Sequence, residues 1–158
     1  MSQTDILGKL VLSSNFGIGR IVDINIMGDK EFLVIESEQN SVKNFVPRSD
    51  EESYRFLSEE ATMDSIINDL KTKNDIREFE SKKDRINFYR DQSNVQDITV
   101  ISGLLCELNH LEDRSSTEEK IFSKLIDTIA LEYSYVYKEE IEKSTDIITG
   151  ILQEAKGE

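Results

Sequence analysis

The chain has 158 residues, of which 37% are hydrophobic and 32% charged, and its formal net charge at pH 7 is −13. This length fits one or two small domains, and no segment approaches the ~18 consecutive apolar residues of a transmembrane helix. The negative charge argues against a general nucleic-acid binder, because phosphates repel it. The one cysteine, Cys106, cannot form an internal disulfide, and the residues from Met1 onward lack the pattern of a secretory signal, so we expect a cytoplasmic protein.

The first 47 residues alternate apolar and polar side chains with the period of β-strands. Strands are expected at residues 9–13, 17–26, 31–38 and 42–46, with polar turns at 27–30 and 38–41. Short strands at such spacings are typical of a small barrel or sandwich. Pro47, the only proline, cannot donate to a strand ladder and is therefore expected where the β-region ends.

From Ser49 onward the apolar side chains recur with the period of amphipathic helices. A short amphipathic turn or helix is expected at residues 50–57 and helices at 58–70, 75–89, 95–111 and 118–135, followed by a last helix that begins near 138 or 145 and ends at 152. Ser58 is the expected N-cap of the second segment, and Ser116 with Glu119 forms an expected capping box. The change of period predicts an α+β chain, with a small β-barrel domain at residues 1–52 and an all-α helical domain at 53–158.

Signatures of enzymes and metal sites are scarce. Gly17-Ile18-Gly19 lacks the third glycine and the following helix of a nucleotide-binding loop, so we interpret it as a strand that needs a close backbone approach or a bulge. His110 follows Cys106 by four residues and could share a metal with it, but two ligands on one helix do not close a site. Cys106 is therefore expected in the core or at its boundary. We predict no catalytic residue, no metal, no cofactor and no enzymatic activity.

When the chain is divided into residues 1–50, 51–64, 65–92 and 93–158, only residues 65–92 have more basic than acidic side chains, seven against six. The basic residues are Lys71, Lys73, Arg77, Lys82, Lys83, Arg85 and Arg90, and they are interleaved with Phe79, Phe88 and Tyr89. Basic groups of this kind contact phosphates, and an aromatic ring can wedge against an unstacked base step. The alternative interpretation is a charged helix face stabilised by pairs four residues apart, such as Glu78 with Lys82.

Several segments carry a recognisable order and spacing. The glycine step Gly17-Ile18-Gly19-Arg20-Ile21 joins two strands, Phe45-Val46-Pro47 ends the fourth strand, and Tyr54-Arg55-Phe56-Leu57 follows as a connector. A central helix begins near Ser93-Asn94-Val95, and another begins within Arg114-Ser115-Ser116-Thr117-Glu118-Glu119-Lys120. Over nearly the whole chain, this order resembles the CarD/CdnL family of bacterial transcription regulators. The first part also resembles the RNA-polymerase-interacting domain of the transcription-repair coupling factor.

The resemblance implies that the N-terminal domain is a Tudor-like (SH3-like) barrel that binds the β subunit of RNA polymerase by adding a strand at a sheet edge. The family's contact surface maps onto Ile24, Ile26 and Phe45. Family members often carry arginine at the first and third of these positions, so the polymerase contact expected here is more hydrophobic.

The resemblance also implies a contact with promoter DNA at the upstream fork of the transcription bubble. This sequence has no tryptophan, and Phe79 stands nearest the family's tryptophan wedge. Lys82 and Lys83 stand nearest its basic pair, with Arg85 close by. The expected function is stabilisation of open promoter complexes through weak or non-sequence-specific DNA contacts, without a membrane or a small-molecule substrate. The alternative is an adaptor bound to polymerase whose acidic helical domain binds a protein.

Overall fold

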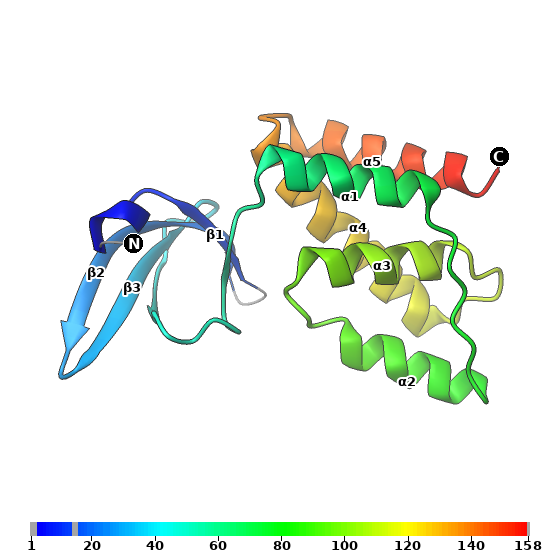
Figure 1. Ribbon diagram of the computed structural model, residues 1–158, viewed down its shortest axis with the longest axis horizontal. Coiled ribbons are helices and arrows are strands. Elements are labelled where there is room, and N and C mark those ends of the chain that lie inside the picture. Colours follow the sequence, from blue (N-terminus) through cyan, green and yellow to red (C-terminus); the bar gives the residue numbers. More distant parts are fainter. Residues whose placement is uncertain (1–2, 14–15, 158) are drawn as a thin grey trace. The chain divides into compact units, whose positions relative to one another are not determined.

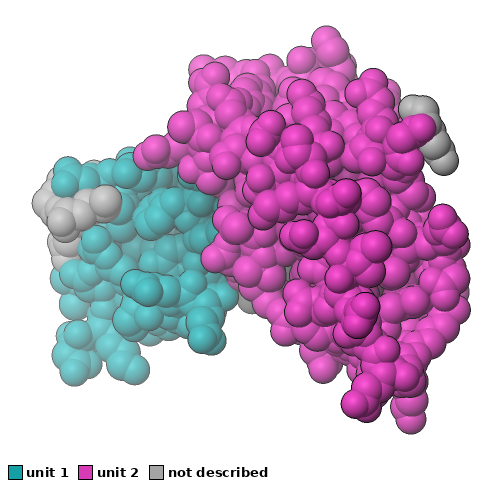
Figure 2. Space-filling model, turned by 45° about the vertical axis from the view of Figure 1, so that its right-hand side comes forward, with its two compact units in different colours: residues 1–57 teal, residues 58–158 magenta. Residues whose placement is uncertain are grey.

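The computed structural model describes residues 3–13 and 16–157. The chain divides into two compact units, Met1–Leu57 and Ser58–Glu158, which Figure 2 colours separately. The first unit contains an antiparallel sheet and the second contains helices (Figure 1), so the predicted α+β class is confirmed. None of the helices formed by the described residues is long and apolar enough to span a membrane.

In the first unit, the described residues form a sheet of five strands in the order β4-β3-β2-β1-β5, and each neighbouring pair is antiparallel. A short 3-10 helix at Gln3–Ile6 precedes β1 (Leu10–Ser13), β2 (Gly17–Met27), β3 (Lys30–Ser37), β4 (Lys43–Pro47) and β5 (Arg55–Phe56). The sheet is not closed, so β4 and β5 are its two end strands.

The long strand β2 is shaped by a bulge and a glycine. A shift in register between Ile21 and Asp23 gives β2 one extra residue against β3, which increases local twist. At Gly19, a Cβ atom would lie 2.5 Å from Cγ2 of Ile35. The close backbone approach that the glycine step predicts is therefore confirmed at Gly19. Ile21 and Ile35 face each other in the core of this unit, and both are fully buried.

Of the two alternatives predicted for residues 50–57, a turn or a short helix, the structure has a turn at 51–52 and no helix. Arg55–Phe56 forms β5 and pairs with Val11 and Leu12 of β1. Tyr54 is buried, and its hydroxyl donates a hydrogen bond to the Arg48 carbonyl at 2.8 Å. The sequence did not predict β5, because a strand this short depends on a long-range partner and shows no local periodicity.

Over residues 58–157, which the structure describes, the second unit is a bundle of five helices, with α4 packed against each of the other four. Its helices are α1 (Glu60–Thr72), α2 (Lys82–Gln92), α3 (Ile98–Asn109), α4 (Ser116–Val136) and α5 (Ile141–Ala155). In Figure 1, α1 and α5 run side by side. The core is apolar and includes the fully buried Leu105, Leu125, Ile129 and Ile148.

Helix α2 begins later than predicted. The sequence predicts a helix over 75–89, but α2 spans Lys82–Gln92, and 73–79 lie outside any helix or strand. Ser81 is the N-cap, and its side chain accepts a hydrogen bond from the Asp84 N–H at 3.1 Å. A serine that satisfies a free N–H in this way favours a helix start over a helix interior.

Two other predicted helix starts move by one residue. The N-cap of α1 is Glu59, not Ser58. In α4, the capping box is formed by Ser115 and Glu118, not by Ser116 and its partner three residues later. Serines occur at both 115 and 116, with glutamates at both 118 and 119, so the motif alone does not distinguish the two registers.

Candidate partner-binding surfaces

The outer edge of β4 has no strand partner among the residues that the structure describes. On the side that faces β3, the Arg48 N–H donates to the Glu31 carbonyl at 2.9 Å. This bond shows which residues of β4 direct their backbone groups toward β3 and which direct them away. Alternate residues of an antiparallel strand turn their N–H and C=O groups away from the partner. By this alternation Lys43 and Phe45 direct their backbone groups to the open edge. Pro47, the last residue of β4, has no N–H to offer there.

Phe45 is the exposed aromatic residue of this edge, with 56% of its surface accessible. It lies opposite Val34, whereas Ile24 and Val46 both lie opposite Leu33. Cross-strand neighbours share a face and successive residues alternate, so Phe45 and Ile24 lie on opposite faces of the sheet. The structure therefore does not gather the predicted polymerase contacts into one surface.

Ile24 and Ile26 lie on the far half of β2, which extends beyond its pairing with β1. Ile24 is half-buried and packs against the core, whereas Ile26 is 64% exposed near the hairpin. The Ile24 N–H is already occupied, because it donates to the Asp23 carboxylate at 2.8 Å. This second edge thus offers fewer backbone donors to a partner strand than β4 does.

Phe79, predicted to contact DNA, is half-buried against the core of the helical unit. Its ring centroid lies 5.4 Å from that of Phe88 and 5.7 Å from that of Tyr89. The Arg77 guanidinium lies over the Phe88 ring, 4.4 Å from its centroid. It also donates two hydrogen bonds to Glu107 at 3.0 and 3.2 Å. The Phe79 ring therefore packs inside the helical unit, and the Arg77 charge is paired with a carboxylate of the same unit.

Arg85, a second predicted DNA contact, binds internal carboxylates. It donates to both oxygens of Glu118 at 2.7 Å and to Asp113 at 3.1 Å. Burial of Glu118 acts to raise the pKa of its carboxyl, but hydrogen bonds from Arg85 and Ser115 outweigh burial and hold that pKa below its usual value. Glu118 is fully buried and Arg85 partly buried, so the pair anchors α2 to the start of α4.

Lys82 and Lys83 remain at the surface in the first turn of α2. Lys82 lies 3.7 Å from Asp113, but both side chains are more than half exposed, and such pairs contribute little. Lys83 forms no ion pair with the described residues. Of the four predicted DNA contacts, these two lysines stay exposed to solvent, Lys82 beside Asp113 and Lys83 without an ion pair to a described residue, whereas Phe79 and Arg85 are engaged inside the unit.

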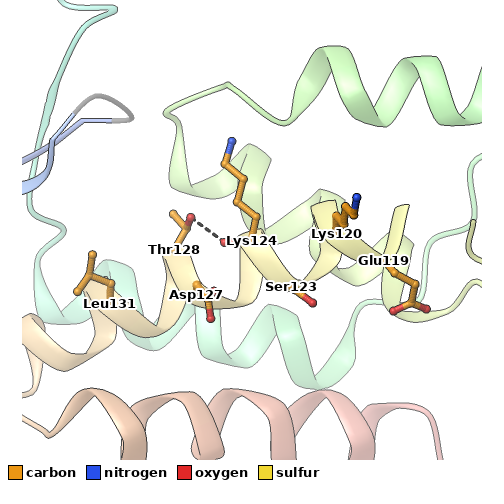
Figure 3. A pocket seen from close by; sticks show the side chains of 7 residues that line it. All are labelled: Glu119, Lys120, Ser123, Lys124, Asp127, Thr128 and Leu131. Atoms are coloured by element: carbon orange, nitrogen blue, oxygen red, sulfur yellow. Dashed lines mark hydrogen bonds between the residues drawn. The ribbon is translucent and has the colours of Figure 1, made fainter. Parts of the chain in front are cut away.

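A depression on α4 does not form a binding site (Figure 3). Its lining residues are Glu119, Lys120, Ser123, Lys124, Asp127, Thr128 and Leu131. They all belong to one helix, and the side chains of Lys124 and Asp127 point in different directions. The Thr128 hydroxyl donates to the Lys124 carbonyl of its own helix at 2.9 Å. No set of polar groups converges there on a ligand.

Cys106 is buried, as the apolar stripe around it predicts. Burial, together with the nearby Asp69, raises the pKa of its thiol to about 11, so the sulfur stays protonated and unreactive at neutral pH. His110 Nδ1 lies 2.9 Å from the Cys106 carbonyl oxygen. Among the residues that the structure describes, no group of three or more potential ligands could hold a metal ion.

The sequence prediction missed Lys43, which belongs to the same open edge as Phe45. A signal was present, because a proline that ends a strand marks an edge, and the residue two before Phe45 shares its orientation. A comparison with models of protein families finds no match, and a comparison with curated proteins finds no significant match either. The family resemblance therefore stays a prediction from the sequence.

Proposed function

We propose that the protein is a transcription regulator that binds the β subunit of bacterial RNA polymerase through the open edge of β4. The observation that carries the proposal is this edge, with the outward backbone groups of Lys43 and Phe45 beside an exposed aromatic ring. Strand addition takes its affinity from main-chain hydrogen bonds and its specificity from alternate side chains. The choice of RNA polymerase as the partner rests on the order of the segments along the chain, which resembles that of the CarD/CdnL family.

The same proposal assigns the first unit to the Tudor-like folds. Consecutive strands pair as neighbours from β1 to β4, and β5 returns to the free side of β1. This arrangement is compatible with a small, partly open barrel. It leaves β4 at the end of the sheet, where a strand of the partner can be added.

Replacing Phe45 by proline is expected to weaken binding to the isolated polymerase β lobe roughly tenfold more than replacing it by alanine. Both variants lose the ring, but only proline also removes the outward N–H, and edge positions tolerate proline when that N–H faces solvent. Isothermal titration calorimetry measures the two dissociation constants. Val100→Ala, at an exposed position of α3 in the helical unit, is the control and should bind like the wild type. Equal binding by the proline and alanine variants would exclude strand addition at β4.

For the helical unit, we propose that Lys82 and Lys83 contact DNA at the upstream edge of the open promoter. A helix dipole disfavours cations in the first turn, so helix stability does not explain two lysines there. The contact would be electrostatic and independent of base sequence. With no chemical step, the protein acts by binding the open complex more tightly than the closed one, which shifts the population.

Reversing both charges, Lys82→Glu with Lys83→Glu, is expected to return the open-complex lifetime to its value without the protein. The measured quantity is the decay of open complexes after addition of a competitor such as heparin. The charge-matched control is Lys120→Glu with Lys124→Glu, at exposed positions on α4, which should keep the lifetime of the wild-type complex. If both double variants behave as wild type, the DNA contact is refuted.

That outcome would favour a second function, an adaptor whose acidic helical unit binds a protein. One observation supports it directly: Arg77 and Arg85 are neutralised by internal carboxylates. Residues 58–158 contain thirteen basic and twenty-three acidic side chains, so the unit repels phosphates outside the start of α2. If the protein is such an adaptor, the Lys82/Lys83 variant still binds the β lobe, and DNA does not contribute to the function of the protein.

A further inference from the structure

A recess between α1 and α4 combines aromatic rings with an acid. It is lined by Asp64, Ile67, Asn68 and Lys71 of α1, by Tyr133 of α4 and by Tyr137, the residue that follows α4. The four residues of α1 occupy positions i, i+3, i+4 and i+7, so they form one stripe along that helix. Neither the β4 edge nor the Lys82–Lys83 pair contributes to this recess, and it belongs entirely to the helical unit.

The two tyrosines form one side of the recess. Their ring centroids lie 4.5 Å apart with an interplanar angle of 50°, and both rings are partly accessible. The Tyr137 hydroxyl donates a hydrogen bond to Oδ1 of Asp64. Partial burial and the neighbouring Asp64 raise the pKa of the Tyr137 phenol, so the hydroxyl stays protonated and continues to orient the carboxylate at neutral pH.

The Asp64 carboxylate is exposed, and Tyr137 is the hydrogen-bond donor that the structure gives it. Its other oxygen can therefore accept from a ligand. Glu60, one turn earlier on α1, adds negative charge on the same side. A carboxylate next to accessible tyrosine rings is a suitable environment for an organic cation, which interacts with the ring face and donates to the acid.

We propose that this recess binds an arginine side chain of a partner protein. Arginine fits better than lysine, because a planar guanidinium can stack on a ring and donate to a carboxylate at the same time. Lys71 lies seven residues after Asp64, about 10 Å along the helix, and forms no ion pair with the described residues. Lys71 pairs with an acidic residue of the partner, and this second contact sets the direction in which the segment binds.

The charge of the unit supports this choice of partner. With ten more acidic than basic side chains in residues 58–158, the helical unit attracts a basic segment over a long range. An anionic ligand would meet Asp64 and Glu60 at the tyrosine end of the recess. The site does not depend on the polymerase contact, because none of its residues lies in the sheet.

The test is an NMR titration of the full-length protein with N-acetyl-arginine amide, compared with N-acetyl-citrulline amide. Citrulline has the same shape and no charge. Arginine is expected to give saturable shifts of the Asp64, Asn68, Tyr133 and Tyr137 amides with a millimolar dissociation constant, and citrulline none. Asp64→Asn, which can still accept from Tyr137, and Tyr133→Leu should each weaken binding at least fivefold.

Asp127→Asn, at an exposed acid of α4 outside the recess, is the charge-matched control and should bind arginine like the wild type. Two results would overturn the proposal. One is shifts spread over the acidic surface that persist unchanged in Asp64→Asn, which indicates non-specific attraction. The other is equal shifts with citrulline, which means that charge is not recognised. Circular dichroism of each variant shows whether the helices are retained.

Discussion

Replacing Glu118 by alanine is expected to lower the free energy of unfolding of the helical unit by about 3 kcal/mol. Removing one partner of a buried ion pair costs roughly 3–5 kcal/mol, because the remaining charge stays buried without compensation. Here the remaining group is the Arg85 guanidinium, whose side chain is 12% exposed and which keeps its hydrogen bond to the exposed Asp113 at 3.1 Å. The expected loss is therefore at the lower end of that range. The same substitution removes the Glu118 carboxylate that accepts from the Ser115 N–H at 3.0 Å.

Urea unfolding followed by far-UV circular dichroism measures this loss. Glu119→Ala is the matched control, because Glu119 is one residue away and pairs with Arg114 at 2.8 Å but is largely exposed. It should change stability by less than about 1 kcal/mol. The double variant Arg85→Met with Glu118→Leu should recover most of the loss, since an apolar pair leaves no charge to compensate. A loss below about 1 kcal/mol in Glu118→Ala would show that the pair does not anchor α2.

Elements with strong local patterns could be predicted from the sequence, and elements that depend on distant partners could not. The strands up to Pro47 and helices α3 and α4 follow from alternation and from a continuous apolar stripe. In contrast, β5 exists because Arg55 and Phe56 pair with a strand more than forty positions earlier. The segment before α2 has charged residues but no apolar stripe, and its Arg77 is held by Glu107, thirty residues away.

The candidate site residues show the same limit. Ile24 and Ile26 are two residues apart in an alternating pattern, yet one packs on the core and the other is exposed near the hairpin. The pattern assigns a face to each residue but does not say how far along the strand the core extends. Arg85 has the composition of a phosphate contact, and only its distance to Glu118 identifies it as an internal ion pair.

Gly19→Ala is expected to destabilise the N-terminal unit by about 2 kcal/mol, within the range for overpacking a well-packed core. The added methyl group would lie 2.5 Å from Cγ2 of Ile35 and 3.1 Å from the Glu36 carbonyl oxygen. Ile35 is fully buried in the core, so it cannot simply rotate into solvent. Relief requires β2 and β3 to separate.

Hydrogen exchange of the β3 amides, measured by mass spectrometry, reports this loss separately from the helical unit. Gly150→Ala, at an open position inside α5, is the matched control and should instead stabilise its helix by roughly 0.5–1 kcal/mol. Unchanged exchange in β3 would mean that the sheet absorbs the methyl group without cost.

Because β4 is held in the sheet by β3 alone among the described strands, faster opening of β3 should also weaken binding of the polymerase lobe. The outward N–H groups of β4 can accept a partner strand only while β3 holds them in place.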